Sequence, residues 1–188
     1  IFSFSLFSNN GLQRMEEKNK IIKKISIIGP ESSGKTLLAN ILSRIINCKK
    51  TNEFAREYLN KKINYDFKDL DKIAVGQNNL VRPFLKKDNY FIADTSNIVT
   101  EIWSKLKFNR VSKKVAEISK SEIFDGYILC KPDIPWEFDK LRENPKNRME
   151  IYNYYIDTLK ERKLDFIIAK GTLINRTISC LDFIKFSK

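Results

Sequence analysis

The chain has 188 residues and a mass of 22.1 kDa, which predicts one domain with a core large enough to fold alone. Hydrophobic residues make up 42% and charged residues 31%, a balance typical of a globular protein and not of a disordered chain. The formal net charge of +12 suits an anionic ligand without identifying one. The chain contains no histidine, which excludes Ser-His-Asp and Cys-His catalysis, histidine-ligated metal centres and histidine general bases.

The three cysteines, Cys48, Cys130 and Cys180, are an odd number and widely spaced, with no CxxC pair. This pattern favours neither a disulfide framework nor a zinc site. A reducing cytoplasm is therefore the expected compartment. No apolar run approaches the roughly 18 residues of a membrane span, so no membrane partner is expected.

Residues 1–14 lack an initiator methionine, a basic leader segment and a small-residue cleavage site, and they are unlike a signal peptide. Met15 is expected to be the biological start. Residues 1–20 are accordingly interpreted as a disordered or non-native extension, and residues 21–188 as the folded domain.

Short apolar, β-branched runs alternate with helical patterns along the chain, which predicts an α/β fold with a five-stranded parallel sheet flanked by helices. The expected strands are 24–28, 49–53 (the weakest), 89–93, 126–130 and 165–169. Apolar residues at helical spacing predict helices over 35–46 and 96–108, and a third that begins near Pro145. Residues 67–87 are expected to form a partly exposed helix or helix pair.

A phosphate-binding loop follows the first expected strand. Residues 29–36 read GPESSGKT, a full match to GxxxxGK[ST] between an apolar strand and an amphipathic helix. In such loops successive backbone N–H groups wrap the phosphates, and the helix N-terminus adds partial positive charge. Lys35 is expected to reach the β- and γ-phosphates, and the Thr36 hydroxyl to bind Mg²⁺. The predicted nucleotide-binding residues are Gly29, Pro30, Glu31, Ser32, Ser33, Gly34, Lys35 and Thr36.

Two carboxylates stand at predicted strand ends, where open α/β sheets bind their ligands. Asp94 follows the strand 89–93 and could hold Mg²⁺ through water or act on a substrate hydroxyl; alternatively, Asp94 or Ser96 caps the next helix. Glu53 and Arg56 follow the second strand. Because histidine is absent, Glu53 and Asp94 compete for the role of general base. The alternative for Glu53 and Arg56 is a solvated i, i+3 ion pair.

Residues 131–148 contain three prolines, Trp136, Arg142 and Arg148. This composition favours a lid that closes on the transferring phosphate, with a plain surface loop as the alternative. Gly171, after the last strand, could let the backbone approach an adenine ring or merely turn the chain. No basic run carries interleaved aromatic residues, so no nucleic-acid partner is expected.

In this order, the motifs resemble the ribosylnicotinamide kinase domain of bacterial NadR-type proteins. They are GPESSGKT (29–36), NEFAREYL (52–59), Gly76-Gln77, DTSNIVTEIW (94–103), CKPDIPWEFDKLR (130–142) and Arg148. The resemblance implies that residues 21–188 form a P-loop kinase with a small lid, and that this kinase uses ATP and Mg²⁺. It also implies transfer of the ATP γ-phosphate to the ribose 5′-hydroxyl of nicotinamide riboside, giving nicotinamide mononucleotide.

Carried onto this chain, the resemblance implies particular roles. Lys35, Glu53, Asp94, Arg142 and Arg148 would be catalytic; Glu53, Arg56, Asp94 and Trp136 would bind the riboside; Thr36 and Asp94 would bind the metal; Gly171 would join the ATP site. Lys140 stands where the family pattern has glycine. Adenylyl transfer and repression, which need histidines or further segments, are expected to be absent from this chain. A regulatory P-loop protein that binds GTP or ATP, with phosphoinositides as a second ligand and no kinase activity, is the alternative.

Overall fold

A computed structural model of the chain describes residues 23–60, 62, 64–87, 89–138 and 146–185. Five strands form one sheet in the order β2-β3-β1-β4-β5, and all of the strand pairs are parallel. The strands are β1 (Lys24–Ile28), β2 (Lys49–Thr51), β3 (Phe91–Asp94), β4 (Gly126–Cys130) and β5 (Phe166–Ala169). The helices are α2 (Lys35–Ile45), α3 (Phe54–Asn60), α4 (Phe67–Leu85), α5 (Asn97–Phe108), α6 (Lys113–Ser121), α7 (Arg148–Glu161) and α8 (Leu173–Lys185).

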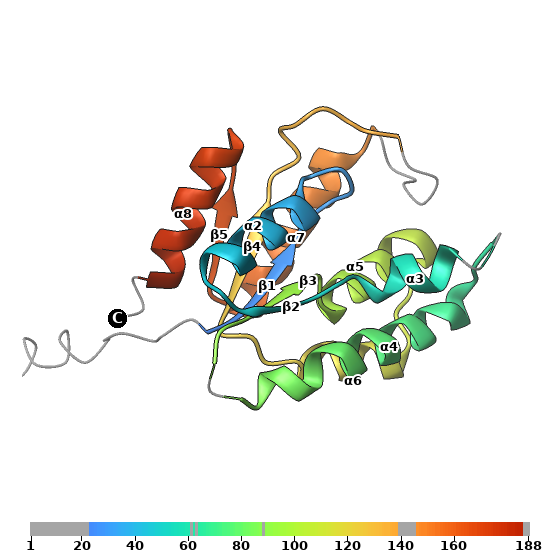
Figure 1. Cartoon of the computed structure of the whole chain (residues 1–188). Helices are drawn as coiled ribbons and strands as arrows, with labels where there is room; N and C mark the ends of the chain where they lie inside the picture. Colours follow the sequence, from blue (N-terminus) through green and yellow to red (C-terminus); the bar gives the residue numbers. More distant parts are fainter. Residues whose placement is uncertain (1–22, 61, 63, 88, 139–145, 186–188) are drawn as a thin grey trace, which may run out of the picture.

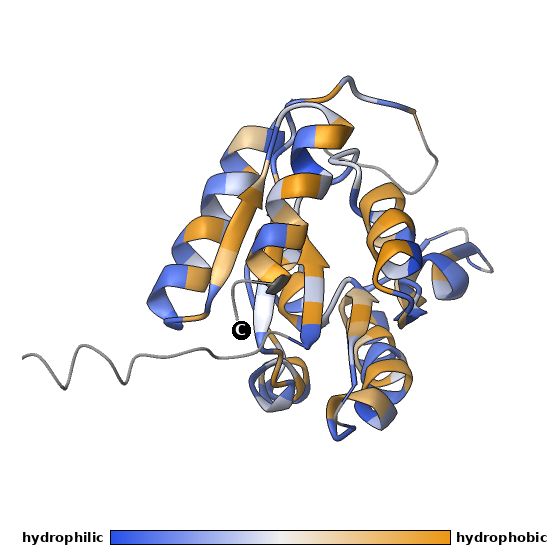
Figure 2. Cartoon of the chain, turned by 60° about the vertical axis from the view of Figure 1, so that its left-hand side comes forward, coloured by the Kyte–Doolittle hydropathy of each residue, from blue (hydrophilic) through white to orange (hydrophobic). Residues whose placement is uncertain are grey.

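Helices cover both faces of the sheet (Figure 1). Because side chains alternate along a strand, Ile25 and Ile27 of β1 pack into a core with α2 and α8. Ile28 joins the opposite core, which draws on α4, α5 and α7. In Figure 2 the strands of the sheet are coloured mostly as hydrophobic, whereas the helices around them alternate hydrophobic and hydrophilic residues. The result is a three-layer α/β/α fold with β1 at its centre.

A third buried cluster lies among helices alone. Ala55 and Leu59 of α3 pack with Leu70 and Ile73 of α4 and with Val115 of α6. This cluster extends the molecule beyond the β3 side of the sheet (Figure 1). It places α3 and α5 beside the carboxyl ends of the strands, where open α/β sheets bind their ligands.

The predicted five-stranded parallel sheet flanked by helices is confirmed. Strands 24–28 and 126–130 match to the residue, whereas β2 ends at Thr51 because α3 begins at Phe54. Residues 67–85 form a single helix, which decides between the two forms expected there. The third predicted helix begins at Arg148. The pattern did not identify α3, α6 and α8. Residues 1–20, predicted to be an extension, lie outside the described part of the chain, and that interpretation stays a prediction.

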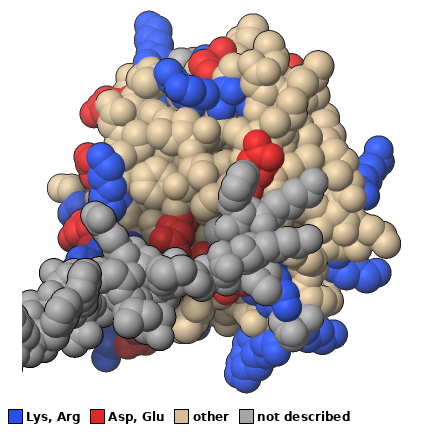
Figure 3. Space-filling view, turned by 90° about the vertical axis from the view of Figure 1, so that its left-hand side faces the viewer, with Lys and Arg blue, Asp and Glu red and all other residues tan. Residues whose placement is uncertain are grey.

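On the α8 side of the molecule, the visible surface of the described residues carries no continuous stripe of like charge. Figure 3 shows the lysines and arginines of this face scattered and mixed with acidic residues around an uncharged area. In the described part of the chain, no helix combines the length and the apolar character that crossing a membrane requires.

Candidate active site

The P-loop connects β1 to α2 and depends on two glycines. Gly29 has φ +141°, and a Cβ there would lie 2.6 Å from the carbonyl oxygen of Cys130 at the end of β4. Gly34 has φ +83° at the start of α2. Both values lie in the region that favours glycine. The loop therefore turns tightly against the sheet and directs its backbone towards the N-terminus of α2.

Lys35 lies over the loop. Its Nζ donates hydrogen bonds to the carbonyl oxygens of Gly29, at 2.9 Å, and Pro30, at 2.8 Å. Thr36 is exposed in the first turn of α2. A cation, a hydroxyl and the positive end of a helix thus meet at one place, as an anionic ligand such as a polyphosphate requires.

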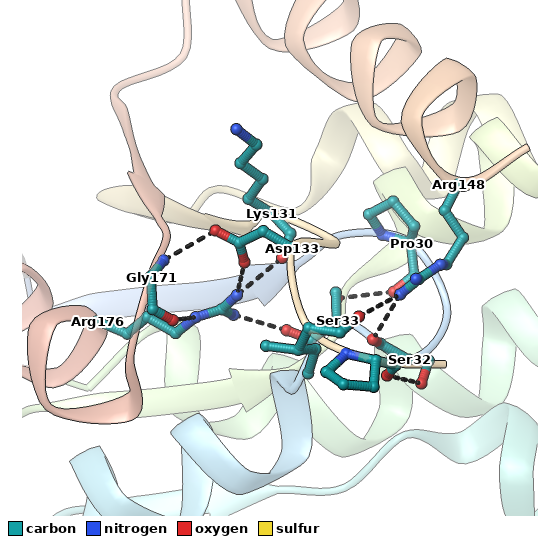
Figure 4. A network of polar contacts seen from close by, with 10 residues as sticks. Pro30, Ser32, Ser33, Lys131, Asp133, Arg148, Gly171 and Arg176 are labelled. Carbon is teal, nitrogen blue, oxygen red and sulfur yellow. Dashed lines mark hydrogen bonds and ion pairs between the residues drawn. The ribbon is translucent and has the colours of Figure 1, made fainter. Parts of the chain in front are cut away.

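Arg176 of α8 binds the P-loop through its guanidinium group, as Figure 4 shows. Only 3% of this residue is exposed. Its guanidinium donates to the carbonyl oxygens of Ser33 (2.8 Å), Lys131 (2.9 Å) and Gly171 (3.0 Å), and it forms an ion pair with Asp133. A buried arginine can supply several donors in one fixed plane. It joins the P-loop to the segments that follow β4 and β5.

Gly171 belongs to this network. It has φ +78°, and its N–H donates to Oδ2 of Asp133 at 2.8 Å. The predicted contact of Gly171 with an adenine ring stays a prediction.

Arg148, at the start of α7, also reaches the P-loop (Figure 4). One of its guanidinium nitrogens donates to the carbonyl oxygens of Ser32 (3.2 Å) and Ile134 (3.1 Å). Its charge lies 5.6 Å from the ring centroid of Trp136, within cation–π range. The backbone N–H of Glu137 donates to the Ser32 hydroxyl at 3.0 Å. The described part of the predicted lid is therefore tied to the loop.

Arg142, Lys140 and Pro145 lie outside the described residues. The predicted role of Arg142 therefore stays a prediction.

The two candidate carboxylates differ in exposure. Glu53 keeps 24% of its side chain exposed and pairs with Arg56, with 3.4 Å between Oε2 and Nε. Asp94, the last residue of β3, is only 2% exposed. Burial raises the pKa of the Glu53 carboxyl; the Lys35 charge opposes this shift and the Asp94 charge adds to it. The structure therefore brings Glu53, Asp94 and Lys35 into one electrostatic group, and the i, i+3 pair of Glu53 and Arg56 exists as well.

A cavity of about 450 Å³ runs from the P-loop to the gap between α3 and α5. Its polar end is lined by residues 29–36 together with Glu53 and Arg56, all of them predicted site residues. Its other end is lined by Ala55, Leu59, Val99, Ile102, Trp103, Leu106, Lys107, Ile134, Glu137, Ile151 and Tyr155. Asp94, Trp136, Arg148 and Gly171 are not among the lining residues.

The sequence predictions missed the apolar wall of the cavity. Ile102, Trp103 and Leu106 show the spacing of one helix face, which marks a buried face but does not say whether protein or ligand covers it. The sequence signal that could have pointed to a ligand was the large aromatic residue Trp103 on this helix face. In the structure Trp103 is partly exposed.

The described residues contain no cluster of three or more acidic or cysteine side chains able to enclose a metal ion. Mg²⁺ does not need such a cage, because it is usually bound by one or two carboxylates, substrate phosphates and water. The Thr36 hydroxyl lines the cavity, and Asp94 is paired in the sheet with Ile27, two residues before the P-loop; both side chains are oxygen donors of the kind this ion prefers. The donor set fits Mg²⁺.

A family described as "AAA domain" matches residues 24–176. The chain belongs to this family. It is also 28% identical over 179 residues to the trifunctional NAD biosynthesis/regulator protein NadR of Salmonella typhimurium, and 27% identical to the Escherichia coli protein of that name. Each alignment covers 90% of this chain and 44% of the relative, so the chain spans less than half the length of these relatives.

Solved structures with the same fold include a NadR protein in complex with NAD and AMP-PNP and a NadR protein in complex with NR. Each has a TM-score of 0.74 and 22% identity, covering 89% of this chain and 51% or 50% of the other. A thymidylate kinase from Ehrlichia chaffeensis has a TM-score of 0.62 at 14% identity, covering 86% of this chain and 97% of that one. The resemblance to NadR-type proteins and the P-loop kinase fold are thereby confirmed.

Proposed function

We propose that this chain transfers the γ-phosphate of Mg·ATP to the ribose 5′-hydroxyl of nicotinamide riboside, giving nicotinamide mononucleotide. The observation that carries the proposal is the single cavity that joins the P-loop, the Glu53 carboxylate and an apolar compartment. A polyphosphate and a small nucleoside require these two environments side by side. The similarity to NadR proteins, one of which was solved with NR, supports nicotinamide riboside as the acceptor.

On the donor side, the backbone N–H groups of residues 29–36 and the ammonium of Lys35 bind the β- and γ-phosphates. Lys35 exchanges its bonds to the Gly29 and Pro30 carbonyls for phosphate oxygens. Thr36 and Asp94 would hold Mg²⁺, which neutralises charge on the β- and γ-phosphates when it is bound. Arg148, which already contacts the Ser32 carbonyl, adds a planar donor group beside the loop.

On the acceptor side, Glu53 is the proposed general base. It lines the cavity, whereas Asp94 is buried at the end of β3. A raised pKa makes the Glu53 carboxylate a better proton acceptor than an ordinary surface carboxylate. Glu53 therefore takes the proton of the ribose 5′-hydroxyl as the hydroxyl oxygen bonds to the γ-phosphorus. The bond between the γ-phosphorus and the β–γ bridging oxygen breaks, and ADP leaves with that oxygen. Trp103 and the apolar side chains near it enclose the base of the nucleoside and exclude water.

A coupled ADP-release assay tests the proposal. The purified chain is given Mg·ATP with a panel of nucleosides that includes nicotinamide riboside, and the phosphorylated product is identified by mass spectrometry. ADP release that depends on nicotinamide riboside and yields nicotinamide mononucleotide supports the proposal. Tight ATP binding with no ADP release, whichever nucleoside is added, contradicts the proposal and favours a regulatory nucleotide-binding protein.

A further inference from the structure

Gln77, in the middle of α4, bridges the two segments that carry the candidate carboxylates. Only 1% of the residue is exposed. Its Oε1 accepts a hydrogen bond from the backbone N–H of Phe54 at 2.9 Å. Its Nε2 donates to the carbonyl oxygen of Thr95 at 3.2 Å. Phe54 directly follows Glu53, and Thr95 directly follows Asp94, so one side-chain amide connects the two segments that carry the carboxylates.

The backbone of Thr95 needs such support. Its φ is +86°, a conformation that a β-branched residue adopts only when its surroundings impose it. The Thr95 N–H donates to the carbonyl oxygen of Ile27 at 3.1 Å, and the Thr95 carbonyl accepts from Gln77. The strained residue is thus held on both sides, immediately after the Asp94 carboxylate whose direction its backbone helps to set.

Gly76 explains how the first turn of α3 comes close enough to Gln77. A Cβ on Gly76 would lie 2.1 to 2.4 Å from ring carbons of Phe54. The glycine therefore serves a close approach between α3 and α4. It allows the ring of Phe54 to lie against α4, which brings the Phe54 N–H to the Gln77 side chain.

Other contacts hold the same elements together without Gln77. Asn97, at the start of α5, donates to the carbonyl oxygen of Ala74 on α4 at 3.1 Å. Leu59 of α3 and Leu70 of α4 belong to one apolar cluster. Removal of the Gln77 amide therefore leaves the helices packed and changes chiefly the two backbone segments that the amide holds.

We propose that Gln77 is a positioning residue that fixes Glu53 and Asp94 relative to each other by holding Phe54 and Thr95, with Gly76 providing the close approach that this requires. The effect on turnover rests on the proposed kinase function. The effect on the two backbone segments does not.

The first test is Gln77→Met, which keeps most of the side-chain length but cannot donate a hydrogen bond to a carbonyl. We expect kcat to fall about 100-fold, since a small misplacement of reacting groups has a cost of this order, while KM for both substrates changes less than about threefold. Ser104→Ala is the matched control. It loses one hydrogen bond of a buried side chain, from the Ser104 hydroxyl to the Arg110 carbonyl at 2.7 Å, without a link to either carboxylate.

The second test is the double variant Gln77→Met/Thr95→Gly. Glycine adopts a positive φ without the strain of threonine, so the turn after Asp94 keeps its conformation more readily when the Gln77 bond is lost. We expect the double variant to recover part of the kcat that Gln77→Met loses. A Gln77 side chain with only a structural role would give no such recovery, because a second change would add to the damage.

The third test is independent of activity. Hydrogen–deuterium exchange of the substrate-free protein should be faster in segments 52–57 and 93–98 of Gln77→Met than in wild type, and unchanged there in Ser104→Ala. If the wild-type chain shows no nucleoside-dependent turnover, the proposed function fails and exchange alone decides the inference. Unchanged exchange in either segment overturns it. If the wild-type chain is active, a kcat of Gln77→Met within about threefold of the wild-type value also overturns the positioning role of Gln77.

Discussion

Asp94 ends β3 and Glu53 lies two residues after β2, but their surroundings assign them different chemistry. Glu53 has 24% of its side chain exposed and lines the cavity. Asp94 is 2% exposed and lies at the end of a central strand. Two carboxylates in different environments commonly divide a reaction between them. Single-residue variants can separate the two roles.

Lys35→Ala tests the phosphate-binding end of the site. The variant loses the ammonium placed over the loop by the Gly29 and Pro30 carbonyls. We expect kcat to fall about 100-fold or more, with the thermal unfolding midpoint little changed. Lys113→Ala, with a 91% exposed side chain, is the control. Wild-type turnover in Lys35→Ala would remove the P-loop from the mechanism.

Asp94→Asn and Glu53→Gln should fail in different ways. If Asp94 holds Mg²⁺, higher Mg²⁺ or added Mn²⁺ should restore part of the activity of Asp94→Asn. No metal concentration should restore Glu53→Gln, because an amide cannot accept the proton. The N-cap of α5 is Ser96, so the alternative in which Asp94 caps this helix is wrong. If Asp94 does not take part in metal binding, Asp94→Asn should leave kcat unchanged at every metal concentration.

The pH dependence of turnover carries the signature of the base. The raised pKa of Glu53 means that the carboxylate takes up a proton at a higher pH than an ordinary glutamate, whose pKa is about 4.3. We expect kcat/KM to fall as the pH falls through this raised value. This fall at acidic pH should be absent from the pH profile of the residual activity of Glu53→Gln. An unaltered fall in that variant would assign it to another group.

At the scale of elements, a buried glutamate that directly follows α6 binds the first residue of α5. Glu122, 5% exposed, accepts hydrogen bonds from the backbone N–H of Asn97 at 2.7 Å and from its side-chain amide at 2.5 Å. Burial raises the pKa of Glu122 to about 7, and the two Asn97 bonds oppose the shift. The folded state therefore holds this proton more tightly than the unfolded chain.

This proton makes stability depend on pH. Stability linked to Glu122 is present below the pKa of the unfolded chain and is lost as the pH rises through the raised value. The expected loss in unfolding free energy is up to about 3 kcal/mol. Glu122→Gln should flatten the dependence measured by urea denaturation between about pH 5 and about pH 8. Glu117→Gln, at a 66% exposed site, should leave it unchanged; equal slopes in wild type and Glu122→Gln would contradict the prediction.

Sequence patterns located the elements whose signals are local. Strand 126–130 is fully buried and apolar, and the P-loop is one continuous motif of eight residues, so both were found. Helix α8 was missed, and its outward Ile174 and Ile178 are 70% and 54% exposed, which blurs the contrast between its faces. The end of β2 was placed too late because the Phe54–Gly76 contact that begins α3 is tertiary.

The same distinction applies to the site. Glu53 and Arg56 were singled out because they follow a strand in a chain without histidine, and in the structure both line the cavity; their roles stay a prediction. Arg176 could not be predicted. It binds the carbonyl of Ser33, 143 positions earlier in the chain, and nothing in its neighbouring sequence distinguishes it from a solvated arginine.

At the scale of the whole molecule, Arg176 makes the nucleotide site depend on the packing of α8. We expect Arg176→Met to weaken ADP binding and to lower the unfolding free energy by about 3 kcal/mol, because it leaves Asp133 and buried carbonyls unpaired. Arg176→Lys should recover only part of both, since an ammonium cannot reproduce the planar set of donors. Calorimetric titration with ADP and thermal unfolding measure the two effects. Arg44→Met, at an exposed site on α2, is the control; a destabilised Arg176→Met that binds ADP normally would contradict the coupling.

The link between α8 and the P-loop also has a consequence for protein synthesis. The 143 positions that separate Ser33 from Arg176 correspond to a delay on the order of 10 s on the ribosome. During this time β1 and α2 have emerged, but the guanidinium that fixes the Ser33 carbonyl has not. The nascent chain therefore gains its full affinity for nucleotide only when α8 has been made and has docked. Bound nucleotide would then stabilise the domain with docked α8 more than it stabilises the first half of the domain alone.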